Sequence, residues 1–306
     1  MKREEYKKIF WRAGQEITPE TFIQADNYIC AQHNLIRKII NRRYYGLLPV
    51  NDETIPAFSV KADVRASEIY IEKLICYGIT REGYLIEFND DQLSSAMKDR
   101  LLIPNSIYDA GYVVIRINPF EQTLIEPVEN EETPFSRPVY EFDIKELSHI
   151  KENELPILKI EVHNRRLQID RNYIPPCMSI LAHEKLLEYY RTAKQLATDI
   201  QTSLTLKKAQ FRELIFPASG LFFDLDQFSL NEPPYFLIQL LKKIVKTFGF
   251  FLADIHPIDE SILEMPYNHD DIAETLRTLT ACLEEIRLII GKKEERVIEE
   301  DFTPKI

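Results

Sequence analysis

The segment Tyr173-Ile174-Pro175-Pro176 separates two regions whose apolar residues recur with different periods. On its N-terminal side, short apolar runs such as residues 112–117 (Tyr-Val-Val-Ile-Arg-Ile) are rich in β-branched residues and are separated by Gly, Asn, Asp and Pro. This pattern is typical of the strands of a sandwich or barrel. The two prolines favour an extended, stiff link, because the residue before a proline avoids the α region. We therefore expect a β-rich domain over residues 1–175.

Six segments of this region carry the strand pattern: residues 67–77, 84–88, 112–117, 139–144, 157–163 and 167–169. Gly78 and Gly83 are expected to bracket a turn, and Asn118-Pro119 to end a strand. Asn164-Arg165 predicts a tight turn, and the acidic, proline-containing residues 126–138 predict an exposed loop. The exception is residues 19–44, where Thr18 is a candidate N-cap of a helix with Pro19 at its first position.

C-terminal to Pro176 the apolar residues recur at alternating steps of four and three. They form three series: Leu186, Tyr190, Ala193, Ala197, Ile200 and Leu204; Leu237, Leu241, Ile244, Phe248, Phe251 and Ile255; and Ile272, Leu276, Leu279, Leu283, Ile286 and Ile290. This spacing predicts three helices, each with a narrow apolar seam for bundle packing. Three seams in one chain are expected to leave apolar surface for an oligomer to bury, although periodicity does not fix the number of subunits.

The ends of these helices are also signalled. Residues 217–234 predict a loop, and Pro234 suits the first turn of the second helix. Asn268 or Asp270 is the expected cap of the third helix, and Gly291 its end. The expected organisation is thus a helical domain over residues 176–291, followed by a charged tail over residues 292–306.

Composition excludes several classes of function. The 306 residues are 45% hydrophobic and 28% charged, as in an ordinary soluble globular protein, and their net charge of −11 argues against nucleic-acid binding. A local basic stretch (Arg37, Lys38, Arg42 and Arg43) is more simply the solvated basic end of a helix. The N-terminal residues lack the apolar core of a signal peptide.

Membrane insertion and a disulfide framework are not expected either. The most apolar stretch, residues 235–255, is interrupted by three lysines and an aspartate, so it does not predict a membrane span. Cys30, Cys76, Cys177 and Cys282 are scattered, with no pair at metal-ligand spacing. They indicate reduced thiols and a cytoplasmic protein.

Motifs of catalysis are missing from the sequence. It has no glycine-rich phosphate loop, GxSxG or HExxH, and its six histidines lie far apart. Asp224 and Asp226, or Asp90 and Asp91, are carboxylate pairs, but solvated acidic loops explain them better than calcium or acid–base chemistry. We expect no catalytic residue, no cofactor and no metal site; an enzyme with a dispersed active site is the weaker alternative.

Two groups of residues resemble the TssK family, baseplate subunits of type VI secretion systems. The first comprises Trp11, Gly14, Pro19, Phe22, Asp26, Tyr28, Tyr45 and Gly46. The second comprises Ile174, Pro175 and Pro176 at the link and Met265, Pro266 and His269 before the last helix. Ala13 stands where the family motif has Glu, and Asp270 where it has Pro. The family's C-terminal head is also not represented, so we expect a headless variant or a shortened chain.

The resemblance implies an α+β, multidomain fold with an N-terminal β-sandwich shoulder, similar to that of siphophage receptor-binding proteins, on an α-helical bundle neck. It implies a homotrimer that docks onto the wedge subunits TssF and TssG at the cytosolic side of the inner membrane, with membrane-complex proteins as further partners. The residues of the neck that are expected to hold the trimer together include Met265, Pro266 and His269. The others are Leu186, Tyr190, Ile200, Leu204, Leu241, Phe248, Leu276, Leu279, Leu283 and Ile286.

Two points stay open at the level of sequence. Trp11, Phe22 and Tyr28 are interpreted as core or staple residues, with an interface contact as the alternative, and Gly14 and Gly46 as turn positions with positive φ. The alternative function is that of a shoulder-and-neck structural protein, of receptor-binding or adaptor type, in a phage tail or an extracellular contractile injection system.

Overall fold

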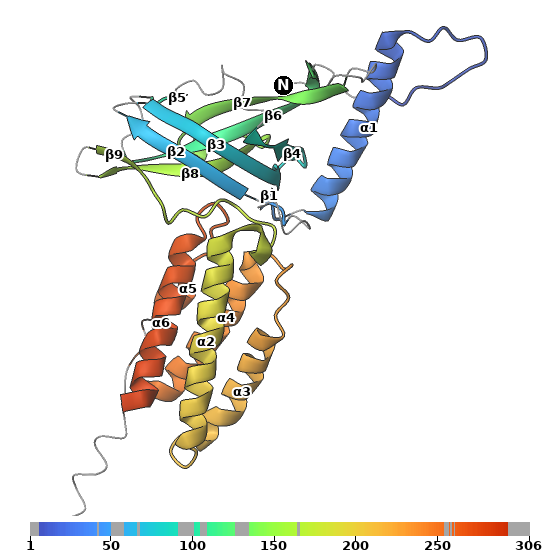
Figure 1. Cartoon of the computed structure of the whole chain (residues 1–306). Helices are drawn as coiled ribbons and strands as arrows, with labels where there is room; N and C mark the ends of the chain where they lie inside the picture. Colours follow the sequence, from blue (N-terminus) through green and yellow to red (C-terminus); the bar gives the residue numbers. More distant parts are fainter. Residues whose placement is uncertain are drawn as a thin grey trace, which may run out of the picture. The chain divides into compact units, whose positions relative to one another are not determined.

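The chain forms two compact units, Met1–Arg171 and Asn172–Ile306, which we call the β unit and the helical unit (Figure 1). The computed structural model describes residues 6–41, 43–49, 58–65, 68–90, 101–104, 109–125, 135–163, 166–253, 257, 259 and 261–292. The expected turn at Asn164-Arg165, most of the loop 126–138 and the charged tail lie outside these residues. The fold class is α+β, as predicted.

Two antiparallel sheets make up the described strands of the β unit. In the first, β3 (Glu68–Ile79) pairs with β1 (Gly46–Leu47), β2 (Phe58–Arg65), β4 (Leu85–Phe88) and β5 (Leu101–Leu102). The second has the order β7 (Phe135–Lys145), β6 (Ala110–Ile125), β8 (Glu154–His163) and β9 (Arg166–Ile169). A short 3-10 helix (Leu147–His149) follows β7.

The two sheets pack face to face as a sandwich. The ring of Phe88 in β4 lies edge-on to Tyr140 and Phe142 of β7, with centroids 5.3 and 5.5 Å apart. The Glu87 N–H also donates to the Tyr140 hydroxyl (3.1 Å). Aromatic pairs of this kind add to the area that each ring buries, so these contacts join the sheets through their interiors.

A β-bulge sets which side chains of β3 face the interior. Ile69 and Ile71 are buried, and so are Leu74 and Cys76, which lie out of phase with them. The pairing with β2 skips Glu72, which is the extra residue of the bulge. Because side chains alternate strictly along a regular strand, one inserted residue is needed to keep both apolar pairs on the buried face.

Prolines and glycines inside the strands correct two predictions. β6 does not end at Asn118-Pro119 but continues to Ile125, with an irregularity between Asn118 and Gln122 that accommodates the proline. Gly78 lies within β3 rather than at a turn, and a Cβ there would lie 2.9 Å from the Gly46 carbonyl oxygen. Gly83, with φ of 87°, does occupy the turn that follows β3.

One ion pair is buried in the β unit. The Glu154 side chain is fully buried, and Lys145 Nζ lies 2.5 Å from its Oε1. The Lys151 N–H donates to Oε2 (2.8 Å). The carboxylate therefore has a partner on both oxygens, as a buried charge requires.

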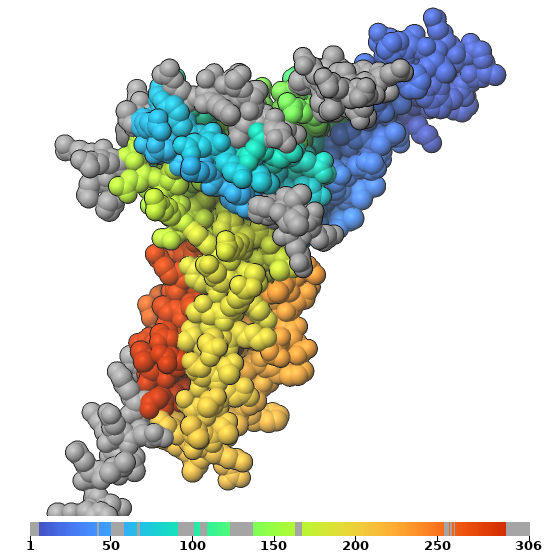
Figure 2. Space-filling view, in the orientation of Figure 1, coloured from blue at the N-terminus to red at the C-terminus, as the bar shows by residue number. Residues whose placement is uncertain are grey.

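The helical unit packs four long helices around one apolar core. They are α2 (Glu184–Leu206), α3 (Arg212–Asp226), α4 (Pro234–Leu252) and α6 (Ala273–Lys292). A 3-10 turn (Ile180–Ala182) precedes α2 in sequence, and the short α5 (Ser261–Glu264) lies between α4 and α6. On the face shown in Figure 2, α2 in yellow lies beside α6 in red. Phe222 of α3 and Phe248 of α4 stack in the core, with ring centroids 5.9 Å apart.

α2 starts with a partly buried histidine cap. His183 is the N-cap residue, and its Nδ1 accepts a hydrogen bond from the Lys185 N–H (3.2 Å). Burial, with a smaller contribution from the charge of Lys185, lowers the pKa of His183 to about 4. The imidazole is therefore neutral at neutral pH, which is the form that can accept this bond.

Three predictions about helix boundaries are wrong. Residues 217–234 are not a loop, because α3 runs through Pro217 to Asp226. The last helix begins at Ala273 rather than after an Asn268 or Asp270 cap; Asn268 Oδ1 instead accepts from the Asp270 N–H (3.1 Å) in the preceding turn. Gly291 lies inside the last turn, which reaches Lys292. Pro234 is at the first turn of α4, as predicted.

Candidate partner-binding surfaces

Helix α1 (Pro19–Ile40) starts where the sequence predicts. Thr18 is its N-cap and Pro19 lies in its first turn. The Thr21 N–H donates to Thr18 Oγ1, and the Thr18 N–H donates to Thr21 Oγ1, both at 3.4 Å. This reciprocal capping box satisfies donors that a helix N-terminus otherwise leaves unpaired. Gly14, with φ of 77°, forms the turn before it.

The side of α1 that faces the sheets of the β unit is polar. Asn34 is buried, and the turn containing Gly83 approaches it so closely that a Cβ at Gly83 would lie 2.5 Å from the Asn34 carbonyl oxygen. Lys38 Nζ lies 3.2 Å from Glu152 Oε2, and Arg37 Nη1 donates to Asn34 Oδ1 (3.3 Å). The C-terminal half of α1 is thus attached through backbone proximity and polar contacts rather than through an apolar core.

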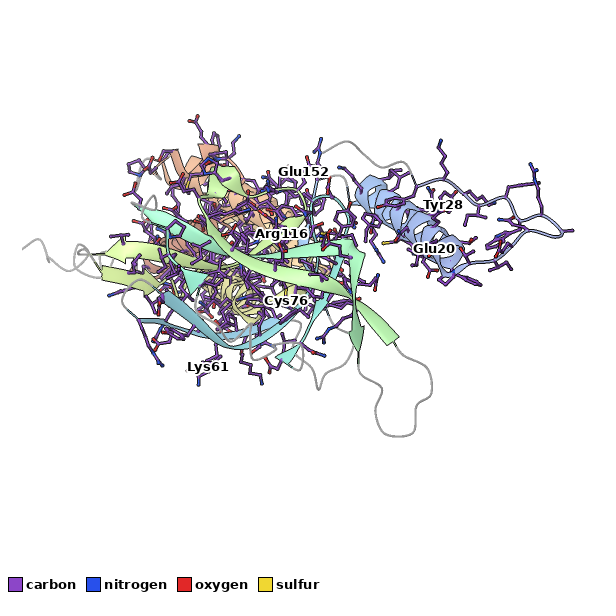
Figure 3. The ribbon with its side chains drawn as sticks, turned by 90° about the horizontal axis from the view of Figure 1, so that it is seen from above. Glu20, Tyr28, Lys61, Cys76, Arg116 and Glu152 are labelled. Atoms are coloured by element: carbon purple, nitrogen blue, oxygen red, sulfur yellow. The ribbon has the colours of Figure 1, made fainter. Side chains whose placement is uncertain are left out.

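A hollow of about 770 Å³ lies between α1 and the sheets. On the helix side it is lined by Asp26, Asn27, Cys30, Asn34 and Arg37, and on the sheet side by residues of β3, β4, β6 and β7. Figure 3 shows Tyr28 and Glu20 on the part of α1 that lies to the side of the sheets, away from Cys76 and Arg116. α1 is therefore held mainly near its C-terminal end.

The opposite side of α1 is apolar and exposed. We call it the outer face; its residues step by three and four and are Phe22, Ala25, Ile29, Gln32, Ile36 and Ile39. Phe22, Ile29, Ile36 and Ile39 are each 50–58% exposed. Ile40 at the end of the helix is 74% exposed. In Figure 2 the blue surface of α1 extends beyond the sheets.

This exposure makes the outer face a candidate interaction surface. Most helices in proteins owe their stability to packing of an apolar face rather than to helix propensity. Contiguous apolar patches on the surface mark interaction sites. Covering the outer face would contribute on the order of 5–10 kcal/mol before the costs of association.

The N-terminal motif residues take part in this exposed surface, which corrects their interpretation as core residues. Trp11 is 50% exposed and Phe22 58% exposed, and their rings contact each other at 6.5 Å between centroids. Tyr28 is partly exposed and Asp26 exposed on α1. Of the two readings of Trp11 and Phe22, the interface contact is the one compatible with their exposure.

Tyr45 and Gly46, by contrast, lie in the interior of the β unit. Tyr45 is buried; Arg81 Nη2 donates to its hydroxyl (2.8 Å), and the guanidinium lies over its ring at 4.7 Å. Gly46 has φ of 116°, as predicted, and pairs with Ile79 at the start of β1. Both residues shape the sheet edge rather than a contact surface.

The link residues and those before α6 are structural in the helical unit. Ile174, Pro175 and Pro176 are buried, and the Cys177 thiol donates to the Pro175 carbonyl oxygen (3.1 Å). His269 Nδ1 lies 2.6 Å from the Tyr267 hydroxyl. Met265 is partly exposed and Pro266 exposed; Lys242 Nζ donates to the carbonyl oxygens of Leu263 (3.0 Å) and Met265.

The seam residues expected to line a trimer are buried inside a single chain. Their exposed fractions are at most 7%: Leu186, Tyr190, Ile200, Leu204, Leu241, Phe248, Leu276, Leu279, Leu283 and Ile286. The expectation that these seams leave surface for an oligomer is therefore wrong, because α2, α3, α4 and α6 cover one another's apolar sides. The helical unit does expose other large apolar side chains, among them Phe216 (88%) and Phe223 (65%) on α3 and Phe250 (80%) on α4.

The described residues contain no group of three His, Cys, Asp or Glu side chains arranged to hold a metal ion. Cys76 is fully buried, and burial raises the pKa of its thiol to about 12, so it is not a nucleophile at neutral pH. Among the helices of the described chain, none is both long and apolar enough to cross a membrane.

The sequence does carry a periodic signal for the outer face. The steps from Phe22 to Ile39 are those that revealed the three helices of the C-terminal region. Periodicity alone does not show which side of a helix is covered by the same chain, so this surface became visible only in the fold.

The fold is that of solved TssK structures. A crystal structure of TssK matches with a TM-score of 0.61 and 15% identity, over 92% of this chain and 69% of that one. A chain of the TssK-TssF-TssG baseplate subcomplex, from cryo-electron microscopy, matches with a TM-score of 0.60 and 13% identity, over 92% and 99%. TssK from the EAEC type VI secretion system, in complex with a nanobody, matches with a TM-score of 0.59 and 13% identity, over 87% of this chain and 68% of that one. No family model and no curated protein matches the sequence. At these identities the similarity is one of architecture, and the chain has a TssK-like fold.

Proposed function

We propose that this protein is a structural subunit of a type VI secretion baseplate and has no catalytic role. The observation that carries the proposal is the similarity to a TssK chain within the TssK-TssF-TssG subcomplex, which covers 92% of this chain and both of its units.

The proposed partners are wedge proteins of the TssF and TssG type, and the β unit is the proposed docking part. Two features support this division. The β unit carries an exposed apolar surface on α1 and around Trp11, whereas the predicted seams of the helical unit are used internally. Aromatic side chains such as those of Trp11 and Phe22 are enriched in the cores of protein interfaces.

The proposed assembly is a homotrimer at the cytosolic side of the inner membrane, with proteins of the membrane complex as further partners. Three β units in one assembly would bind a wedge with avidity, because after the first contact the other two act at high effective concentration. The gain over a single β unit is expected to be on the order of 10²-fold when the geometry allows simultaneous contact.

Reconstitution tests this proposal. The full chain, residues 1–175 and residues 176–306 are each mixed with a purified TssF–TssG-type wedge, and binding is measured by size-exclusion chromatography and titration. We expect the full chain to bind, residues 1–175 to bind markedly more weakly, and residues 176–306 not to bind. Binding by residues 176–306 alone would reverse the division of roles. Absence of binding by the full chain would refute the proposed function.

A further inference from the structure

We propose that residues 293–306 of this chain, which follow α6, bind along the outer side of α4 in the helical unit. We call these residues the acidic tail and their binding site, a hollow of about 730 Å³, the lysine groove. The inference goes beyond the proposed function, which assigns no partner to this side of the helical unit. The lining of the groove includes Lys242, Lys243, Lys246, Gly249 and Phe250 of α4 and Leu263 and Glu264 of α5.

The lysine groove is basic and partly apolar in a chain whose net charge is −11. Lys243 and Lys246 are exposed, and among the described residues neither ammonium group is held in an ion pair. Phe250, one helical turn further along, is 80% exposed. Glu264 is the one carboxylate among the described residues that line the groove. Free cations beside an exposed aromatic ring favour a ligand that carries both carboxylates and apolar side chains.

Lys242 fixes the second wall of the groove. Its Nζ donates to the carbonyl oxygens of Leu263 (3.0 Å) and Met265, so the end of α5 is held against α4. The ammonium group of Lys242 is thereby occupied by the backbone of its own unit. The attraction of an anionic ligand therefore depends on Lys243 and Lys246, which have no such contacts among the described residues.

The course of α6 brings the acidic tail to one end of the groove. α4 and α6 start at the same end of the unit, because the ring of Tyr235 in α4 lies 5.2 Å from that of Tyr267, shortly before α6. The two helices pack together and have 19 and 20 residues, so Lys292 lies at the same end as Phe250. Packed helix axes are about 8–10 Å apart and six extended residues span roughly 20 Å, so the tail reaches Phe250 by residue 298.

The order of residues in the acidic tail matches the order of groups in the groove. Coming from α6, the tail presents residues 297–298 (Val-Ile), then residues 299–301 (Glu-Glu-Asp), then Phe302. From the end of α4 the groove presents Phe250, then the two free lysines, then Leu263. These lysines are about 4.5 Å apart along the helix axis, and the three acidic residues span roughly 7 Å when extended. Both ammonium groups can therefore meet a carboxylate while the apolar residues on either side contact the apolar ends of the groove.

Proteolysis of the full chain tests the charge complementarity. Thermolysin, which cleaves beside apolar residues, should remove the tail slowly from the wild type, as followed by mass spectrometry. Lys243→Glu/Lys246→Glu should raise this rate on the order of tenfold, because two attractive contacts become repulsive. The matched control, Lys208→Glu/Arg212→Glu, reverses two exposed charges between α2 and α3. This region also lies beside the end of α6, since Lys207 Nζ donates to the Ile290 carbonyl oxygen (2.6 Å), and the control should keep the wild-type rate.

Reversal of the tail provides a rescue. Glu299→Lys/Glu300→Lys alone should be cleaved about as fast as the groove variant. Combined with Lys243→Glu/Lys246→Glu it should return towards the wild-type rate, because the same contacts form with opposite polarity. Circular dichroism should show that all variants are folded. An unchanged rate in the groove variant, an equal increase in the control, or no rescue by the combination would overturn the proposal.

Disulfide trapping in the full chain tests the position of the tail. Under mild oxidation Lys246→Cys/Glu300→Cys should form an internal disulfide in high yield. Gln201→Cys/Glu300→Cys should form little, although Gln201 is exposed and lies a similar distance from the end of its helix, α2. The native cysteines are common to both variants. Equal yields would contradict binding in the groove, and covalent dimers in place of the internal disulfide would assign the groove to the tail of another copy and overturn the proposal.

Discussion

Helices α1 and α6 have the same apolar spacing and the opposite environment. In α6, Leu276, Leu279 and Leu283 are fully buried by the other helices of the unit. In α1, Ile29 and Ile36 at equivalent steps are half exposed, and the helix turns its polar side to its own domain. The difference teaches that heptad spacing defines an apolar side of a helix but not the molecule that covers it. In the helical unit the same chain covers it, whereas in α1 the described residues of the chain leave it exposed.

The largest expected effect comes from replacing the same residue type in the core and on the surface of the helical unit. Phe248→Ala removes a fully buried ring that stacks on Phe222, and we expect it to lower the free energy of unfolding by about 3–5 kcal/mol. Phe216→Ala removes a ring that is 88% exposed and should change it by less than about 0.5 kcal/mol. Chemical denaturation followed by circular dichroism at 222 nm measures both. A comparable loss in the two variants would show that Phe216 is covered in solution.

The β unit allows a similar comparison between ion pairs. Lys145→Met leaves the fully buried Glu154 with only the Lys151 N–H, and we expect a loss of about 3 kcal/mol, since an uncompensated buried charge is costly. Lys61→Met breaks a pair with Glu72 that is exposed on both sides, and should leave stability unchanged. Differential scanning calorimetry provides the measurement. An unchanged transition for Lys145→Met would mean that Glu154 is not buried as a charge.

The cap of α2 titrates, because it is His183, whereas the cap of α1, Thr18, does not. The pKa of His183 is depressed to about 4 in the folded state, against an ordinary value of 6.5. His183 therefore binds a proton more tightly in the unfolded chain than in the folded protein, and protonation favours unfolding as the pH falls below 6.5. The contribution of His183 is complete above pH 6.5 and decreases as the pH falls towards 4, by roughly 2–3 kcal/mol in total.

His183→Asn isolates this effect, because asparagine can still accept the hydrogen bond from the Lys185 N–H but does not titrate. Urea unfolding between pH 7 and pH 4 should show a smaller loss of stability in this variant than in the wild type. Identical pH profiles would remove His183 as a source of acid sensitivity.

The smallest expected effect concerns the cap of α1. Thr18→Ala removes one half of the capping box and should cost about 1 kcal/mol of helix stability, whereas Thr18→Ser keeps the hydroxyl and should cost little. Hydrogen exchange of the first turn, at Thr21 and Phe22, reports this fraying. Equal protection in Thr18→Ala and the wild type would indicate that packing on another molecule, rather than the cap, holds this turn.

Much of the fold was predictable because the two periods of the sequence are distinct. The seam from Leu186 to Leu204 predicted α2, and its residues are buried as a helical stripe. The predicted segments at 139–144 and 157–163 lie within β7 and β8. Capping chemistry placed the start of α1 at Thr18 and Pro19.

The errors have local physical causes. Residues 217–234 were predicted to form a loop, but α3 continues through Pro217, in its second turn, to Asp226. Pro119 was interpreted as a strand end, but the pairing of β6 is irregular there, so no ladder hydrogen bond from the proline is needed. The bulge at Glu72 and the burial of Glu154 depend on pairing between distant segments, which spacing along the chain does not encode.

The candidate site was less predictable than the fold. The motif residues Trp11 and Phe22 were singled out, but their chemistry alone suggests a core as readily as an interface. The structure shows them half exposed at the start of the outer face. The seam residues of the helical unit were assigned to a trimer because the number of neighbouring helices within one chain, here including α3, was underestimated.

Affinity purification from the native cell tests the central claim most directly. The tagged full chain, at its natural level, is isolated with its partners after mild cross-linking, and the partners are identified by mass spectrometry. The account predicts that wedge proteins of the TssF and TssG type are recovered in near-stoichiometric amounts with this chain. Recovery of phage capsid and tail proteins in their place, or of the chain without any wedge protein, would contradict it.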